Sequence, residues 1–90
     1  MELKELLSND FKVYVDVYEL HTKDGKITPI GFVWENGLRY AVDKVTDIRR
    51  AASLKAGGAG LRYTVKIGNF ERFMFLEEEA GVRRWFMERK

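Results

Sequence analysis

The chain has 90 residues, of which 46% are hydrophobic, with no cysteine, one histidine and a formal net charge of +2. This length suits one small domain, which we predict to span residues 1–90. The lack of cysteine excludes disulfides, a thiolate nucleophile and cysteine-based metal sites, and it is typical of a reducing compartment, so we expect a cytoplasmic protein. No apolar run reaches the roughly 18 residues of a membrane helix, and the N-terminus does not resemble a secretory signal, so no membrane partner is expected.

Alternating apolar and polar residues, separated by turn-forming dipeptides, predict an all-β fold. Asp24-Gly25, Asn36-Gly37, Gly68-Asn69 and Ala80-Gly81 lie between runs rich in β-branched and aromatic residues. We interpret them as two-residue hairpin turns, because both central residues of a type I′ turn need positive φ. The strands are then expected at about residues 11–21, 27–35, 38–45, 61–67, 71–78 and 82–88. We therefore predict about six antiparallel strands, each paired with its neighbours in the chain, curled into a small barrel or sandwich.

Three segments depart from this simple pattern. Residues 2–7 place three leucines on one side and predict a short N-terminal helix, which needs to dock on the body to be stable. Residues 46–56 are compatible with a short helix capped by Thr46 or with a strand that continues to about residue 52, and the strand is slightly favoured. Gly31 lies inside a predicted strand and indicates a bulge or a barrel bend there.

The sequence carries little catalytic chemistry. Its one histidine, His21, lies at a predicted strand end beside a turn, where a solvated side chain is expected, and no second histidine is available to form a metal pair. There is no Gly-x-Ser-x-Gly elbow and no standard phosphate-binding glycine motif. We therefore predict a non-enzymatic protein with no catalytic residues, no metal site and no cofactor.

Positive charge gathers in the C-terminal half, where residues 44–90 carry eleven Lys and Arg against six Asp and Glu, whereas residues 1–43 carry five against eight. A glycine-rich loop at residues 55–60 has basic residues on both sides, and Tyr63 in the strand after it is expected to point inward. Such a surface suits the phosphates and bases of single-stranded nucleic acid, and a solvated face with cross-strand ion pairs is the competing interpretation. The predicted nucleic-acid or phosphate contacts are Arg49, Arg50, Lys55, Gly57, Gly58, Gly60, Arg62 and Lys66.

Aromatic residues suggest a second kind of surface. Several predicted strands are apolar on both faces, and a homodimer is one way to cover the face that an open sheet would leave wet. Tyr14 and Tyr18 share a strand face and are the predicted protein interface, whereas Trp34 and Trp85 are expected in the core. The leading hypothesis is a binding or accessory module that contacts nucleic acid. The alternatives are a protein–protein interaction module or homodimeric structural domain and, less favoured, a small-molecule binder or enzyme using the barrel mouth.

Two stretches carry a resemblance to known proteins. Residues 34–45 (Trp-Glu-Asn-Gly-Leu-Arg-Tyr-Ala-Val-Asp-Lys-Val) and 57–63 (Gly-Gly-Ala-Gly-Leu-Arg-Tyr) resemble small single-domain bacterial proteins of unknown function, and the similarity extends from the first strand to Trp85-Phe86. This resemblance implies a bacterial cytoplasmic domain and transfers no catalytic residue. The Trp-x-x-Gly-x-x-Tyr-x-Val pattern is also distantly similar to small domains encoded near translesion polymerases, an association that adds a little weight to the nucleic-acid hypothesis.

Overall fold

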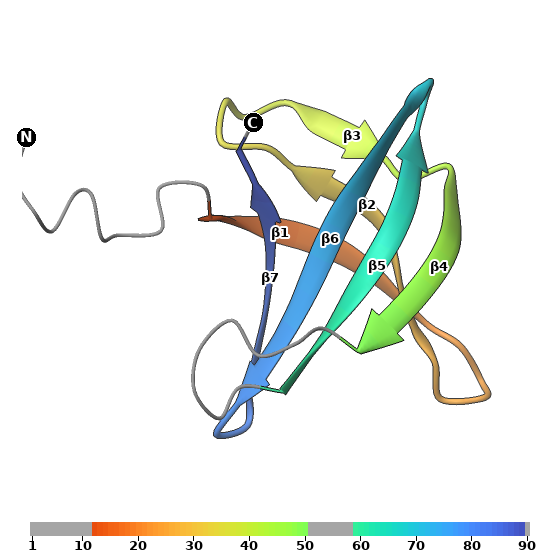
Figure 1. Cartoon of the computed structure of the whole chain (residues 1–90), viewed down its shortest axis with the longest axis vertical. Coiled ribbons are helices and arrows are strands. Elements are labelled where there is room, and N and C mark those ends of the chain that lie inside the picture. The colour runs from red at the N-terminus through yellow and green to blue at the C-terminus, as the bar shows by residue number, and fades with distance from the viewer. Residues whose placement is uncertain (1–11, 51–58, 90) are drawn as a thin grey trace, which may run out of the picture.

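The computed structural model describes residues 12–50 and 59–89, which form an all-β fold of seven antiparallel strands, one more than the number expected. The strands are β1 (Lys12–His21), β2 (Ile27–Val33), β3 (Arg39–Ala41), β4 (Lys44–Arg50), β5 (Ala59–Ile67), β6 (Phe70–Glu79) and β7 (Val82–Glu88). They make one curled sheet in the order β3-β2-β1-β7-β6-β5-β4 (Figure 1). No helix capable of crossing a membrane occurs in these residues, and the helix predicted for residues 2–7 lies outside them.

The strands form where apolar side chains alternate with more polar ones, so that one face of the curled sheet lines a common interior. On β5, Tyr63 and Val65 are 3% and 0% exposed, which confirms that Tyr63 points inward. Each such side chain contributes about 1.5–3 kcal/mol through burial. Trp85 is buried as expected, and Trp34 packs against the core only partly buried. The buried core cluster consists of Phe32, Tyr63, Val65, Met74, Leu76, Trp85 and Met87.

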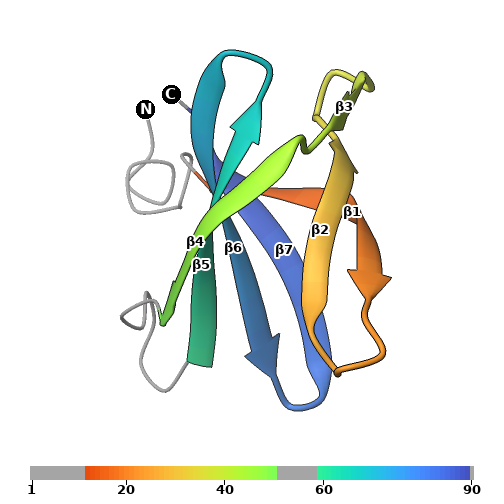
Figure 2. The same ribbon diagram turned by 90° about the vertical axis from the view of Figure 1, so that its right-hand side faces the viewer.

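The single strand predicted at residues 38–45 is divided in the structure, because the chain bends sharply between β3 and β4. At this bend the Val42 N–H donates to the Ile30 carbonyl of β2 at 3.0 Å, and the Asp43 N–H donates to the Lys66 carbonyl of β5 at 2.8 Å. These two hydrogen bonds join the bend to β2 and β5, the strands next to the edge strands β3 and β4, and Figure 2 shows from the side how the chain passes from β3 into β4. The strand favoured over a helix is confirmed for residues 46–50, and residues 51–56 lie outside the described part.

Two bulges adjust the register of the sheet. In β4 the pairing passes from Val45 opposite Val65 to Asp47 opposite Thr64, so that Thr46 is the extra residue. In β2 the extra residue precedes Gly31, which confirms the irregularity predicted there. A Cβ atom at Gly31 would lie 3.1 Å from the carbonyl oxygen of Tyr40, so glycine lets β3 approach β2 closely.

The turn dipeptides mark hairpins correctly, but the prediction of two-residue turns is wrong at Asp24-Gly25 and Asn36-Gly37. There only the glycine has positive φ, and the Gly25 and Gly37 N–H groups donate to the carbonyls of Thr22 and Trp34, which closes three-residue loops. Three-residue hairpin loops usually consist of a type I turn, whose central residues have negative φ, followed by a glycine with positive φ. Only Ala80-Gly81 has positive φ at both residues, 53° and 83°.

Candidate nucleic-acid interface

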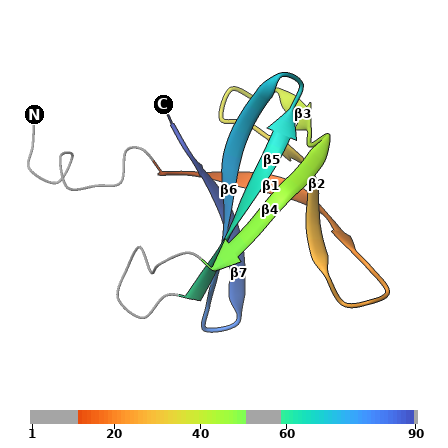
Figure 3. The same cartoon turned by 45° about the vertical axis from the view of Figure 1, so that its right-hand side comes forward.

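Two pairs of cations lie opposite one another on β4 and β5. Lys44 is the cross-strand partner of Lys66, and Arg49 is the partner of Arg62. These four side chains belong to the outer face of the barrel, because Tyr63 and Val65 of β5 fill the interior. Figure 3 shows β4 and β5 side by side on this outer wall. Like charges placed directly opposite one another destabilise a sheet, so this hairpin carries an electrostatic cost that a bound anion would relieve. We refer to Lys44, Lys66, Arg49 and Arg62 as the basic ladder.

Acidic residues compensate the basic ladder only in part. The Arg49 Nε donates to the Asp47 Oδ2 at 2.8 Å, but both side chains are largely exposed, and such pairs contribute little. Within residues 12–50 and 59–89, the side chains of Lys44, Lys66 and Arg62 form no ion pair. The buried Nε of Arg62 also has no hydrogen-bond partner there. Three of the four cations thus have no ion pair with the described residues, although Glu71 of β6 lies opposite Lys66 and offsets part of the charge.

An exposed aromatic ring lies beside the ladder. Phe73 of β6 is the cross-strand partner of Thr64, which lies on β5 between Arg62 and Lys66. Its side chain is 43% exposed, and the Arg62 guanidinium lies 4.5 Å from the centre of its ring. An accessible ring among cations is the arrangement that proteins use to stack bases of a single strand.

The predicted contacts fall into four groups. Arg49, Arg62 and Lys66 are brought together on the outer face. Arg50 is not, because it pairs with Leu61 on the opposite face, and its contact with nucleic acid stays a prediction. Gly60 lies within β5, where a Cβ would be 3.2 Å from the Leu76 carbonyl oxygen, and this close approach explains the glycine without a ligand. The remaining predicted contacts, Lys55, Gly57 and Gly58, lie outside the described residues.

Sequence reasoning missed Lys44 and Phe73. Lys44 lies twenty-two positions before Lys66 in the chain, and only the pairing of β4 with β5 brings the two together. Phe73 belongs to an apolar run that suggests burial, although its place on the outer face follows from alternation with the buried Met74. The sequence gives no signal that Phe73 is exposed, because Phe75 on the same face is 8% exposed.

The two predicted interface tyrosines are both exposed, Tyr14 by 44% and Tyr18 by 49%. Tyr14 is held in place, because its hydroxyl donates to Glu77 Oε1 at 2.9 Å and the Arg84 guanidinium lies 4.3 Å from its ring centre. Partial burial raises the pKa of Glu77, but hydrogen bonds from Tyr14 and Lys12 outweigh it and leave that pKa below its usual value. Tyr14 is therefore part of a fixed polar network as well as of the surface.

The other end of β1 carries a second network, centred on a carboxylate. Glu19 accepts hydrogen bonds from Arg83 Nη2 at 3.0 Å and from Trp85 Nε1, and a ring nitrogen of His21 lies 2.8 Å from its Oε1. The His21 side chain is 57% exposed, in keeping with the strand-end position expected for it. In the described part of the chain no group of three or more potential ligands could hold a metal ion. The network joins β1 to β7 through Arg83 and Trp85.

The resemblance drawn from residues 34–45 and 57–63 stays a prediction. Comparison of the chain with protein-family models, with curated proteins and with solved structures finds no match.

Proposed function

We propose that the protein is a non-enzymatic module that binds single-stranded nucleic acid on the outer face of β4, β5 and β6. The observation that supports this most is the two like-charged cross-strand pairs of the basic ladder, with the exposed Phe73 of β6 opposite Thr64, at a level between the two pairs. Arg62 and Lys66 are four residues apart on β5, a separation of roughly 13 Å. A strand lying along β5 can place phosphates near both cation pairs while one base stacks on Phe73.

The basic ladder fits an extended polyanion better than a single small anion. Its cations lie in two pairs at different heights along the hairpin, rather than converging on one point. Phosphate neutralisation gives affinity without sequence information, and stacking on an aromatic ring accepts any base. We therefore expect binding with little sequence preference. A cytoplasmic location is part of this proposal and agrees with the absence of cysteine.

Replacing two lysines of the ladder should weaken binding and reduce its salt dependence. In the Lys44→Ala/Lys66→Ala variant we expect the slope of log affinity against log salt to fall by about 1.4 for single strands, because two phosphate contacts are lost. Fluorescence anisotropy of labelled single-stranded DNA and RNA, at low and physiological salt, measures both quantities. The matched control is Lys23→Ala/Lys26→Ala, which removes the same charge from exposed residues around the β1–β2 turn.

The same titrations can overturn the proposal. Absence of binding by the unaltered protein at low salt would do so, and so would equal losses in the ladder and control variants, which would indicate unspecific charge attraction. Phe73→Leu separates stacking from charge: it should lower affinity at every salt concentration while leaving the slope unchanged. Duplexes of the same length should bind more weakly, because their bases are not available to Phe73.

A second candidate function is self-association through β1. One face of β1 carries a row of large exposed side chains. They belong to Tyr14, Tyr18 and Leu20, which are 44%, 49% and 50% exposed. If this row forms a dimer, sedimentation velocity should show a dimer that Tyr18→Glu dissociates and that salt hardly affects. Tyr18 is a better test position than Tyr14, because Tyr14 also supports the Glu77 network. A monomer at all accessible concentrations would contradict this alternative.

A further inference from the structure

A recess opens at the end of the barrel near the β2–β3 and β5–β6 turns. Its lining is mostly apolar, unlike the basic ladder. One wall of the recess is aromatic. It consists of Phe32 from β2, Trp34 directly after β2, and Tyr40 from β3. The Phe32 and Tyr40 rings stack with centroids 5.5 Å apart and planes inclined by 24°. The recess has a volume of about 300 Å³, at the small end of the range for ligand pockets.

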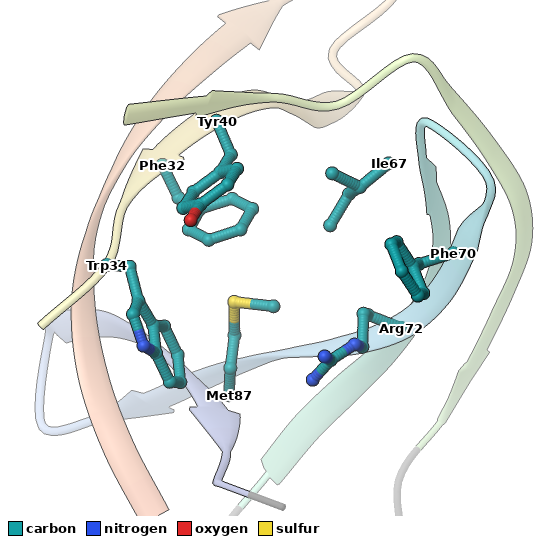
Figure 4. Close-up of a pocket in the computed structure, with 7 residues that line it drawn as sticks. All are labelled: Phe32, Trp34, Tyr40, Ile67, Phe70, Arg72 and Met87. Carbon is teal, nitrogen blue, oxygen red and sulfur yellow. The ribbon is translucent and has the colours of Figure 1, made fainter. Parts of the chain in front are cut away.

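The facing wall contains the one charged group of the recess. Figure 4 shows Ile67, Phe70 and Arg72 opposite the aromatic wall, with the buried Met87 between the two walls. Arg72 comes from the inner side of β6 and is partly buried. In the part of the chain that the structure describes, its guanidinium forms no ion pair and no hydrogen bond.

An unpaired guanidinium in an apolar recess is costly, because partial removal from water is not offset by a partner. The same group is a fork that matches a carboxylate or phosphate with two parallel hydrogen bonds. Flat aromatic walls, for their part, favour a flat ring that can stack on them. We propose that this recess binds a planar ring carrying an anionic group, with the ring against Phe32, Tyr40 and Trp34 and the anion on Arg72.

Two sources can supply this chemistry. One is a free aromatic carboxylate, and the other is a nucleotide, whose base is the ring and whose phosphate is the anion. The recess and the basic ladder share no residue, so this inference does not rest on the proposed function, and either one can fail without the other.

Calorimetric titration with matched anionic and neutral rings tests the inference. The probes are 2-naphthoate with 2-naphthamide, and adenosine monophosphate with adenosine. We expect each anion to bind about tenfold or more tightly than its neutral counterpart, as a hydrogen bond to a charged partner would give. Arg72→Gln should abolish this preference while leaving the neutral rings bound as before, and Arg72→Lys should restore only part of it, because the fork is lost.

Arg84→Gln is the matched control, because Arg84 lies on β7, is exposed and does not line the recess. It should leave the preference for anions unchanged. The inference is overturned if none of the four probes binds, or if Arg72→Gln keeps the preference while its urea unfolding curve shows a folded protein. The naphthoate and nucleotide titrations distinguish the two sources, since a recess for nucleotides should bind adenosine monophosphate more tightly than naphthoate.

Discussion

Met74→Ala should lower the free energy of unfolding by about 2–5 kcal/mol, the usual cost of truncating a buried methionine. The Met74 side chain is fully buried, at 0% exposure, within the cluster that fills the barrel interior. A domain of this size has a total stability of only about 5–15 kcal/mol. The variant should therefore be close to unfolding at 37 °C, and urea denaturation followed by tryptophan fluorescence measures the loss.

The neighbouring residue provides the control. Phe73→Ala removes a larger side chain, but Phe73 lies on the outer face and is 43% exposed, so its loss should cost about 1 kcal/mol or less. The comparison tests which face of β6 is inside. If Phe73→Ala were the more damaging change, the inner and outer faces of β6 would be reversed, and the basic ladder and its aromatic neighbour would not form one surface.

The strands themselves could be predicted from the sequence, since alternation and turn dipeptides are local signals. The bend between β3 and β4 could not, because its only local sign is that the alternation of Leu38, Tyr40 and Val42 ends at the polar pair Asp43-Lys44, which a bulge would also give. What bends the chain there is a set of distant contacts. Besides the two backbone hydrogen bonds to Ile30 and Lys66, the Asp43 carboxylate accepts the Gly68 N–H at 2.7 Å. Tertiary structure thus divides a segment that is locally a single strand.

The basic ladder depends on a single extra residue. Without the bulge at Thr46, Arg49 would lie opposite Leu61 on the inner face, and Arg50 would take the outer position. A shift of one residue exchanges the two faces of a strand, and the only local sign of the bulge is that Val45 and Ile48, three residues apart, share the inner face. Sequence reasoning therefore placed both Arg49 and Arg50 with Arg62, whereas the structure places only Arg49 opposite Arg62.

The recess was beyond sequence reasoning for a different reason. Its lining comes from five strands or their ends, and each residue taken alone has a simpler explanation as core or surface. Trp34 was expected in the core, and Arg72 had no feature that distinguished it from the other basic residues. Only the curl of the sheet, which brings the ends of β2 and β7 towards the start of β6, makes these side chains into one site.

Stability should fall when the pH is lowered from about 5 to about 2, and Glu19 should account for a large part of the loss. Partial burial raises the pKa of Glu19, but hydrogen bonds from Trp85, Arg83 and His21 outweigh it and lower that pKa from 4.5 to about 2. A carboxylate whose pKa is lower in the folded state stabilises the fold above its unfolded pKa, and this contribution disappears as the pH falls through the folded value. We expect about 2 kcal/mol, less than the full shift would give, because water still reaches the carboxylate.

The position of Glu19 explains why this interaction matters. β1 and β7 pair only from Lys12 to Val15, opposite Trp85 to Glu88, and beyond that point the two strands separate. A cleft lies between them, lined by residues of both strands. Glu19 reaches across it to Arg83 and Trp85, so one side chain replaces the missing backbone ladder. Loss of its charge should therefore loosen the seam that closes β1–β3 onto β4–β7.

Urea denaturation of Glu19→Gln across this pH range tests the assignment. Relative to the unaltered protein, the variant should be less stable by about 2 kcal/mol at pH 6, and the difference should close as the pH approaches 2, because glutamine has no charge to lose. Glu88→Gln is the control: Glu88 is exposed and forms no ion pair with the described residues, so it should change stability little at any pH.

A constant difference between Glu19→Gln and the unaltered protein would mean that the shape of Glu19, and not its charge, holds the seam. Acid sensitivity would then have to come from another carboxylate, of which Glu77, held by Lys12, Tyr14 and Arg84, is the next to replace.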